Sequence, residues 1–292
     1  MGESLVGGAT VALVDTPSDA PKPDLIPVDL THVFDLEPHG ADIWLGESPD
    51  YQWGRIYGGL VIAQSLWAAM QTVNPEHEVH SLHGYFILAG DPRQPVRYEV
   101  DRIRNGRSFT TRRVVARQSG GAIFSMSCSF QRYEGTIETQ TATCPAGHRP
   151  PTSPVGLREN SGIDRLDETL AGNPPRSLMW ARFPVDLGDD PRLHACALAY
   201  LSDNNPLDAV ACAHPRGMPA PDEWHDTYMT ASLDHAMWFL RPAQADQWHL
   251  FDMEGHGILR TRGLSTGHVF SDDGSHVATI AQEGLIREVK PD

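Results

Sequence analysis

Three separated stretches of the chain each carry one polar side chain that could hold a water molecule. The first, residues 198–206, begins as the apolar face of a helix and ends in a polar cluster that contains Asp203. The other two are strand-like runs that carry Ser232 and Gln282. A carboxylate can accept a proton from water, and hydroxyl and amide groups can fix the direction of that water. We therefore hypothesise that Asp203, Ser232 and Gln282 meet around one nucleophilic water.

Each of these residues also has an ordinary structural interpretation. Asp and Asn favour turns and caps, so the cluster Ser-Asp-Asn-Asn-Pro around Asp203 is typical of a turn after a helix. Ser232 would otherwise be a strand hydroxyl, and Gln282 a solvent-facing strand residue. Residue types alone favour these structural interpretations over a catalytic group.

Length, composition and charge limit the class of protein. The 292 residues are 40% hydrophobic and 21% charged, which is typical of one large or two small folded domains. No apolar run reaches the roughly 18 residues of a membrane-spanning helix, so no membrane insertion is expected. The net charge of −15 argues against a nucleic-acid partner, because binding phosphates depends on cationic surface. Without a signal-peptide pattern, we expect a cytoplasmic protein.

Other candidate chemistries are weaker. The four cysteines show neither a Cys-x-x-Cys pair nor zinc-finger spacing. His77, His80 and His83 look like a metal cluster, but no carboxylate lies at matching spacing, so structural histidines are favoured. Residues 263–267 match the nucleophile-elbow pattern, but a strand-like run follows where that motif requires a helix. We therefore expect no metal and no bound cofactor.

Hydrophobic periodicity predicts one structural unit near the start of the chain. Residues 1–27, rich in Gly, Ala, Pro and Asp, are interpreted as a flexible tail. A first strand pair is expected at 33–36 and 41–45, followed by a helix from Gly59 to about Val73. An antiparallel meander then covers residues 81–132, and Asn105-Gly106 predicts a two-residue hairpin turn within it.

The same order of elements recurs later in the chain. Residues 134–175, rich in Pro, Gly, Thr and Ser, are interpreted as a linker. Then come a strand, a helix at 192–202 with Asp190 as its N-cap, and further strands with Asp273-Gly274 as a hairpin turn. A spacing near 150 residues indicates a tandem duplication, with repeats at 28–133 and 176–292. The predicted fold class is α+β, with each antiparallel sheet wrapped around its own apolar central helix.

Several motifs together resemble the acyl-CoA thioesterase II family. They are Arg55-Ile-Tyr-Gly-Gly59, Val79-His-Ser-Leu-His-Gly-Tyr-Phe86, Arg104-Asn-Gly-Arg-Ser-Phe-Thr-Thr-Arg-Arg113, Ser129-Phe-Gln131, Ser232-Leu-Asp-His-Ala-Met-Trp-Phe239 and Ala281-Gln-Glu-Gly284. The resemblance covers roughly residues 30–288, in the family's order. It implies a double hotdog fold, with two tandem antiparallel sheets each wrapped around a central helix, and a homo-oligomer, either a dimer or a tetramer.

The resemblance also implies a reaction, the hydrolysis of acyl-CoA thioesters to free fatty acid and coenzyme A. The family's catalytic Asp and Gln match Asp203 and Gln282, and the family's Thr is Ser232 here, which keeps the hydroxyl and lacks the methyl group. Asp203 would then activate a water that Ser232 and Gln282 orient, and no covalent intermediate is required.

The predicted substrate-binding residues are Gly58, Gly59, His83, Arg107 and Arg112. The two glycines could offer backbone N–H groups at a helix start to an anion or a carbonyl oxygen, although a tight turn into the helix explains them equally well. Arg107 and Arg112 belong to a basic run that could meet the phosphates of coenzyme A. A solvated sheet face is at least as good an interpretation of that run.

Two other functions stay open from the sequence. A hydratase or dehydratase of the same fold could use His235 and Asp203 as its catalytic pair. A non-catalytic acyl-CoA-binding protein would keep the pocket without the rate, and Ser232 in place of Thr is the feature that favours it.

Overall fold

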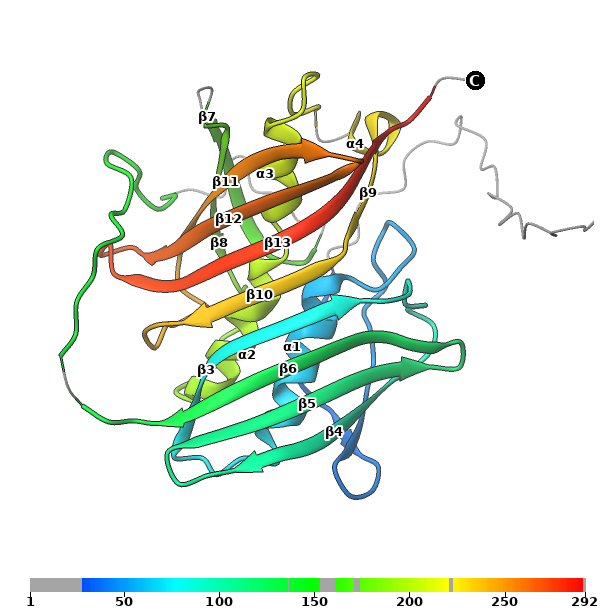
Figure 1. The fold of residues 1–292 in the computed structure, drawn as a ribbon, viewed down its shortest axis with the longest axis vertical. Coiled ribbons are helices and arrows are strands. Elements are labelled where there is room, and N and C mark those ends of the chain that lie inside the picture. The colour runs from blue at the N-terminus through cyan, green and yellow to red at the C-terminus, as the bar shows by residue number, and fades with distance from the viewer. Residues whose placement is uncertain (1–27, 136, 153–160, 171–173, 221–222, 291–292) are drawn as a thin grey trace, which may run out of the picture.

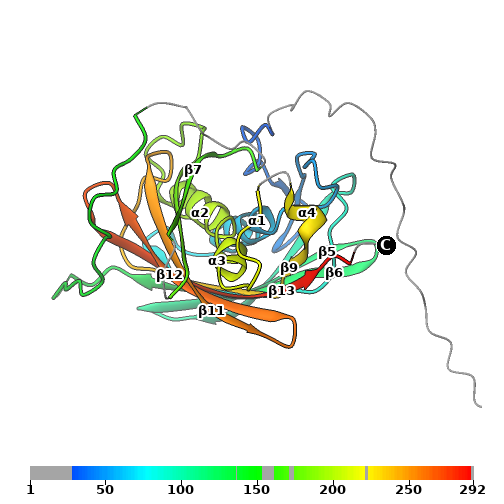
Figure 2. The ribbon, with the colours of Figure 1, turned by 90° about the horizontal axis from the view of Figure 1, so that it is seen from above.

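The computed structural model describes residues 28–135, 137–152, 161–170, 174–220 and 223–290. Within these residues the chain forms one antiparallel sheet of thirteen strands and four helices. Figure 1 shows the sheet face-on with the helices behind it, and Figure 2 shows the helices on the concave side of the curved sheet. The tail predicted for residues 1–27 lies outside the described residues.

The first half of the chain contributes one helix and six strands. They are β1 (Glu37–Pro38), β2 (Ile43–Gly46), α1 (Gly58–Met70), β3 (His77–Phe86), β4 (Val96–Asn105), β5 (Phe109–Gln118) and β6 (Gly121–Arg132). In the sheet these strands follow the order β1-β2-β4-β5-β6-β3. The helix is confirmed, and its prediction differs by one residue at the start and three at the end. Strands β4, β5 and β6 form the predicted meander, but β3 pairs with β6 and not with its successor β4.

The second half contributes three helices and seven strands. They are β7 (Asp164–Leu170), β8 (Arg176–Arg182), α2 (Pro191–Ser202), α3 (Pro206–Cys212), α4 (Trp224–Thr227), β9 (Tyr228–Ser232), β10 (Asp234–Phe239), β11 (His249–Leu259), β12 (Arg262–Ser271) and β13 (His276–Glu288). Their order is β10-β13-β12-β11-β8-β7, and β9 pairs with β13 as well.

The two halves share one sheet, so the two tandem sheets of the prediction are joined edge to edge. Strand β3 pairs antiparallel with β10, with Leu82 opposite Met237 and Gly84 opposite His235. Without this pairing, each half-sheet would end in a strand with unpaired N–H and C=O groups, an edge that proteins rarely leave bare. Joining the two edges satisfies those groups and makes the halves one body.

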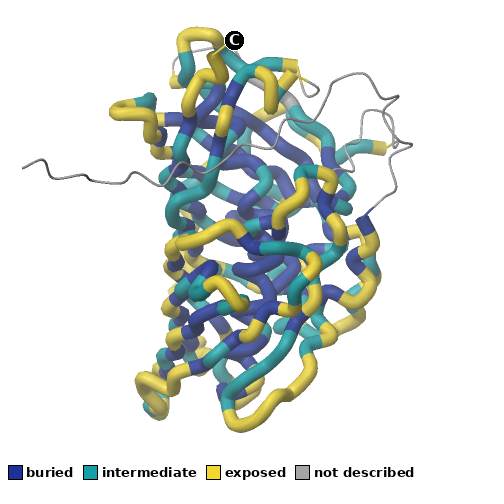
Figure 3. The backbone as a smooth tube through the Cα atoms, turned by 90° about the vertical axis from the view of Figure 1, so that its right-hand side faces the viewer, coloured by how far each residue is buried: buried dark blue, intermediate teal, exposed yellow. Residues whose placement is uncertain are grey.

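The core lies between the concave face of the sheet and the helices, as the dark interior of Figure 3 shows. Helix α1 is buried on almost every side, which confirms the prediction of an apolar core helix. It packs against β4, β5 and β6 and against α2. Its buried polar residue Gln64 is satisfied, because its amide donates to the carbonyl oxygen of Val33 at 2.7 Å and accepts from the Tyr98 hydroxyl at 2.5 Å.

Two local predictions, those for the first strand pair and for the linker, differ from the structure. The first strand pair lies later than expected, because residues 31–34 form a turn and β1 begins at Glu37. The segment interpreted as a linker contains β7, which pairs with β8 at the far edge of the sheet. Its polar composition reflects an edge position, where one side of the strand meets water.

The Asn105-Gly106 hairpin also differs from the prediction. A two-residue turn of this kind needs positive φ at both residues, and neither has it. Instead Gly106 donates its N–H to the Phe109 carbonyl at 3.0 Å, and the register between β4 and β5 shifts near Arg104. The turn at Asp273-Gly274 does use a left-handed glycine, since Gly274 has φ of +84°.

In the part of the chain that the structure describes, none of the helices is long and apolar enough to cross a membrane.

The Asp190 cap gives a direct test of the second helix. Its side chain accepts from the Arg192 N–H at 2.9 Å, and Pro191 occupies the first helical position, as the sequence predicts. Asp190→Ala should therefore lower the free energy of unfolding by about 1 kcal/mol. Urea unfolding followed by circular dichroism measures the change. The exposed neighbour Asp189→Ala is the matched control, and equal loss in both variants would contradict the capping role.

Candidate active site

Asp203 lies where the end of α2 meets the start of α1. It follows the last residue of α2 and is 8% exposed. The Gly59 N–H donates to its carboxylate. A Cβ atom on Gly58 would lie 2.4 Å from Asp203 Oδ2, and one on Gly59 would lie 2.3 Å from the Tyr200 carbonyl oxygen. The two glycines are therefore required for the close approach of the two helices.

The structure brings the three hypothesised catalytic side chains together. The Ser232 hydroxyl, at the end of β9, donates to Asp203 Oδ1 at 3.1 Å. Gln282, on β13, donates from Nε2 to Ser232 Oγ at 2.9 Å. Gln282 is 1% exposed, whereas Ser232 is only partly buried. A carboxylate, a hydroxyl and an amide thus converge within hydrogen-bond distance of one another, although they come from three distant segments.

A bulge between β9 and β10 aims these side chains. Ser232 pairs with Gly284 and Ala236 pairs with Ala281, so three residues lie opposite two on β13. One extra residue reverses the alternation of side chains along a strand. As a result Ser232 and His235, which an unbroken strand would place on opposite faces, both point toward the helices.

Burial sets the protonation of Asp203. Removal from water raises the pKa of its carboxyl group to about 7, and hydrogen bonds from Gln282, Ser232 and the Gly59 N–H act in the opposite direction. The ionisable neighbour Tyr57 has its own pKa raised, first by burial and then by the charge of Asp203, so it stays protonated. Near neutral pH Asp203 is therefore poised between accepting and releasing a proton, as a general base requires.

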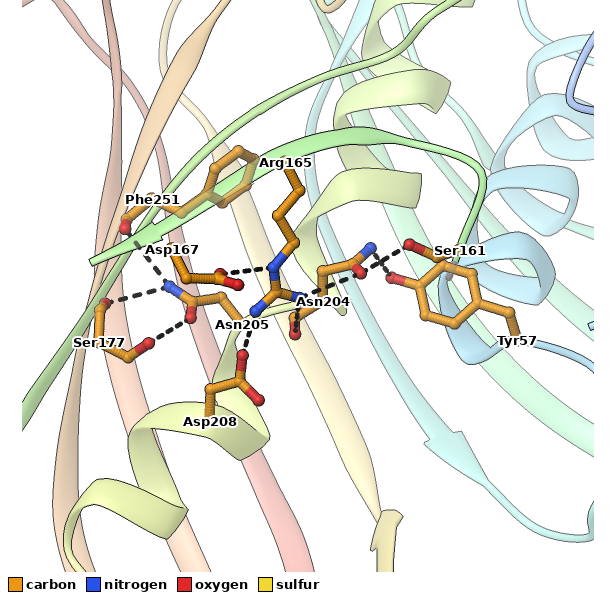
Figure 4. A network of polar contacts seen from close by, with 9 residues as sticks. All are labelled: Tyr57, Ser161, Arg165, Asp167, Ser177, Asn204, Asn205, Asp208 and Phe251. Carbon is orange, nitrogen blue, oxygen red and sulfur yellow. Dashed lines mark hydrogen bonds and ion pairs between the residues drawn. The ribbon is translucent and has the colours of Figure 1, made fainter. Parts of the chain in front are cut away.

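The chain just after Asp203 is held by two asparagines (Figure 4). Asn204 donates from Nδ2 to the Tyr57 hydroxyl at 2.5 Å, and its Oδ1 accepts from the Ser161 hydroxyl at 2.8 Å. Asn205 donates to the carbonyl oxygen of Ser177 at 3.1 Å, and its Oδ1 accepts from the Ser177 hydroxyl at 2.7 Å. These contacts tie the end of α2 to the start of α1 and to β8.

A buried arginine completes this support. Arg165 donates from Nε to Asp167 at 2.5 Å, forms an ion pair with Asp208 on α3, and donates to the Asn204 carbonyl oxygen at 3.1 Å. The two carboxylates raise the pKa of the Arg165 guanidinium, so its charge is kept and compensated although it is buried. Sequence reasoning missed this group, because it treated residues 134–175 as a linker.

The other predicted substrate-binding residues lie away from Asp203. His83 is exposed on the convex face of the sheet, where its ring meets Trp238 at 5.1 Å between centroids. It cannot share a pocket with His235, which faces the helices. Arg107 is exposed in the loop between β4 and β5 and lines a hollow with Arg112.

Arg112 cannot bind phosphate in this conformation. All five of its N–H donors point to protein acceptors: Thr72 Oγ1, Thr72 O, Arg104 O, Thr111 O and Asn105 Oδ1. Thr72 follows the C-terminal end of α1, about 20 Å along the helix from Gly58 at 1.5 Å per residue. Arg112 thus connects the end of α1 to β4 and β5, and its contact with the substrate stays a prediction.

The structure also gives the surroundings of the other motifs in the sequence. Within the described residues, groups of three or more His, Cys, Asp or Glu side chains that could hold a metal ion are absent. Residues 263–267 lie inside β12, paired on both sides, and Ser265 is fully buried. A nucleophile elbow needs a sharp turn between a strand and a helix, so this serine does not form one.

The chain matches two protein-family models that together span most of its length. Residues 48–131 match the acyl-CoA thioesterase N-terminal domain, and residues 141–286 match the acyl-CoA thioesterase C-terminal domain. The chain belongs to the acyl-CoA thioesterase II family. Human acyl-coenzyme A thioesterase 8 is 33% identical to this thioesterase over 93% of the chain and 92% of the relative. Acyl-CoA thioesterase 2 of Haemophilus influenzae is 32% identical over 89% of this chain and 97% of the relative.

Solved structures agree with this assignment. Acyl-CoA thioesterase II TesB2 of Mycobacterium marinum superposes with a TM-score of 0.75 at 38% identity, covering 89% of this thioesterase and 98% of that chain. A protein with a hot dog fold from Alicyclobacillus acidocaldarius superposes with a TM-score of 0.66 at 20% identity, over 90% and 100%. This more distant likeness shows the fold alone.

The raised pKa of Asp203 predicts a dependence of stability on pH. Between about pH 4 and pH 7 the unfolded chain releases this proton while the folded protein keeps it, so the contribution of this group to stability is lost as the pH rises. Asp203→Asn, which cannot ionise, should therefore be more stable than wild type above pH 7, by about 2–4 kcal/mol.

Urea unfolding at a series of pH values measures this difference, which should shrink toward zero near pH 4. The exposed carboxylate variant Asp50→Asn is the control and should show no such trend. A difference between wild type and Asp203→Asn that does not change with pH would contradict the burial argument.

Proposed function

We propose that this thioesterase hydrolyses acyl-CoA thioesters to a free fatty acid and coenzyme A by direct attack of water. The observation that carries the proposal is the convergence of the Asp203 carboxylate, the Ser232 hydroxyl and the Gln282 amide. The names of its relatives specify acyl-coenzyme A as the thioester. The same family match supports a double hotdog architecture, in which each half of the shared sheet holds one central helix.

In the proposed mechanism Asp203 acts as the general base. Its carboxylate takes a proton from the water as the water oxygen bonds to the thioester carbonyl carbon. Ser232 and Gln282 hold the water in line with that carbon. The carbon–sulfur bond then breaks, Asp203 returns the proton to the coenzyme A sulfur, and the carboxylic acid is released. The positive end of the α1 dipole, at Gly58 and Gly59, is suited to stabilise the oxyanion that forms on the carbonyl oxygen.

The hydratase alternative is not favoured by the surroundings of His235. Its Nδ1 contacts Gln282 at 2.5 Å and its Nε2 contacts Ser202 at 2.9 Å. Both ring nitrogens are thus engaged by protein groups, and the ring is 1% exposed. A base that abstracts a proton from carbon needs a free nitrogen aimed at the substrate.

Loss of the base should abolish most of the rate. Asp203→Asn should lower kcat by about 10²-fold or more, because general-base catalysis contributes about 10²–10⁴-fold. Ser232→Ala and Gln282→Ala should each lower kcat, and Ser232→Thr should keep it, since the hydroxyl is retained. Release of free thiol from acyl-CoAs of short to long chain measures the rate.

Asp50→Asn is the control for this series, because that carboxylate is exposed to solvent. Circular dichroism should show that each variant keeps its fold. Thiol release by Asp203→Asn at the wild-type rate would contradict the proposed mechanism. Tight binding of acyl-CoA by wild type without thiol release would replace hydrolysis with the binding-protein function.

The pKa of Asp203 also predicts the pH profile. The carboxylate must be ionised to accept a proton, so kcat/KM should fall as the pH drops below about 7. Initial rates of thiol release at saturating and limiting substrate, measured between about pH 5 and pH 9, give this acid limb of the pH profile. A rate that stays constant down to about pH 5 would show that the base has an ordinary carboxyl pKa.

A further inference from the structure

His235 lies directly behind the proposed catalytic group, on β10. A closed chain of polar contacts begins at Ser202 and ends at Asp203, its neighbour in sequence. Ser202 Oγ lies 2.9 Å from His235 Nε2, and His235 Nδ1 lies 2.5 Å from Gln282 Oε1. Gln282 Nε2 then donates to Ser232 at 2.9 Å, and Ser232 donates to Asp203 at 3.1 Å. His235 therefore connects the end of α2 to Gln282.

The direction of the Gln282 amide decides what the catalytic group can do. The oxygen and nitrogen ends of an amide have almost the same shape, but one end only accepts and the other only donates. In the observed orientation the NH₂ group faces Ser232, which leaves the serine proton for Asp203. If the amide were turned over, its oxygen would accept the Ser232 proton, and Asp203 would lose that hydrogen bond.

Only a donor on His235 Nδ1 selects the observed orientation. An N–H group at that nitrogen can bond to the amide oxygen but not to the amide NH₂. The ring is neutral at pH 7, because burial lowers the pKa of His235 to about 4, and a neutral imidazole carries a single N–H. With the proton on Nδ1, Nε2 is an acceptor, so the Ser202 hydroxyl must donate its single proton to Nε2 and not to the Ala199 carbonyl oxygen, which lies 2.7 Å away.

We propose that His235, held as the Nδ1–H tautomer, is a positioning residue that fixes the Gln282 amide with its NH₂ group toward Ser232 and Asp203. This inference rests on the proposed function, because it assigns the source of order in that same site. The bulge at Leu233 is what makes the contact possible, since it turns His235 to the same side of the sheet as Ser232. The Leu233 N–H and Asp234 Oδ1 bond to the backbone of Glu283 and hold the bulge in place.

The tautomer can be observed directly, without any assay of activity. Two-bond ¹H–¹⁵N correlation spectra of the ¹⁵N-histidine-labelled protein at neutral pH distinguish a protonated from an unprotonated ring nitrogen. The His235 signals are assigned from the spectrum of His235→Asn, in which they are missing. A protonated Nδ1 and an unprotonated Nε2 support the proposal. A protonated Nε2 overturns it, because the Gln282 amide would then be turned over.

Matched substitutions test the consequence for catalysis. The amide nitrogen of Asn occupies the place of imidazole Nδ1, and that of Gln occupies the place of Nε2. His235→Asn should therefore keep kcat within about threefold of wild type, whereas His235→Gln and His235→Leu should lower kcat by about 10-fold to 100-fold with KM within about twofold. A 10-fold to 100-fold loss of kcat is smaller than the whole general-base contribution of about 10²–10⁴-fold, because Asp203 itself is retained.

The pH profile separates positioning from a general loss of stability. Hydrogen bonds from Gln282 and Ser232 lower the pKa of Asp203 against the effect of burial. In His235→Leu these bonds are weakened, so the acid limb of kcat/KM should move to higher pH. His249→Asn is the control, because His249 is also buried and its Nδ1 lies 2.8 Å from a carbonyl oxygen, that of Gln247, outside the site. His249→Asn should have a lower free energy of unfolding than wild type but the same kcat and the same acid limb of kcat/KM.

The outcomes distinguish this inference from the proposed function. Suppose that wild type releases thiol and Asp203→Asn does not, while His235→Leu has the kcat and the acid limb of kcat/KM of wild type. The positioning role of His235 is then wrong, and the proposed attack by water stands. If wild type releases no thiol, the proposed function fails, while the tautomer measured by NMR still decides the orientation of Gln282. Equal activity in His235→Asn and His235→Gln would also overturn the inference, since the position of the donor would not matter.

Discussion

The placement of one carboxylate at the meeting point of two helices is the constraint on which the rest of this structure depends. Asp203 ends α2 and faces the start of α1, and desolvation there raises its pKa to about 7. The positive end of the α1 dipole offsets part of the cost of burying its charge. That approach in turn requires glycine at positions 58 and 59, because a side chain on either would collide with Asp203 or with the Tyr200 carbonyl.

A carboxylate so placed must be held, and the surrounding polar groups do so from both sides. On one side Asn204 and Asn205 fix the chain after α2, and the buried Arg165 connects this turn to α3. On the other side β9, β10 and β13 present Ser232, His235 and Gln282 through a single bulge. Most of these contacts join distant segments of the second half, and the hydrogen bond from Asn204 to Tyr57 connects them to the first half.

The residues of the candidate site differ in how far the sequence predicted them. Asp203, Ser232 and Gln282 could be named because they fall within motifs that resemble a family, and not because of their spacing, which reaches 79 positions from Asp203 to Gln282. His235 was paired with Asp203 only for the hydratase alternative, and its contacts with Gln282 and Ser202 were not predicted. A run of arginines looks the same in sequence whether a member faces solvent, as Arg107 does, or is buried and donates all its hydrogens to the protein, as Arg112 does.

The sequence by itself determined the elements whose signals are local. The apolar helix α1, the capped helix α2 and most strands of the two meanders follow from periodicity, caps and breakers within a few residues. Tertiary structure alone decided that β3 and β10 join the halves into one sheet, that β7 occupies its edge, and that an extra residue at Leu233 turns Ser232 and His235 to the same side. Strand order, bulges and the raised pKa of Asp203 depend on contacts between residues far apart in the chain, and no local pattern encodes them.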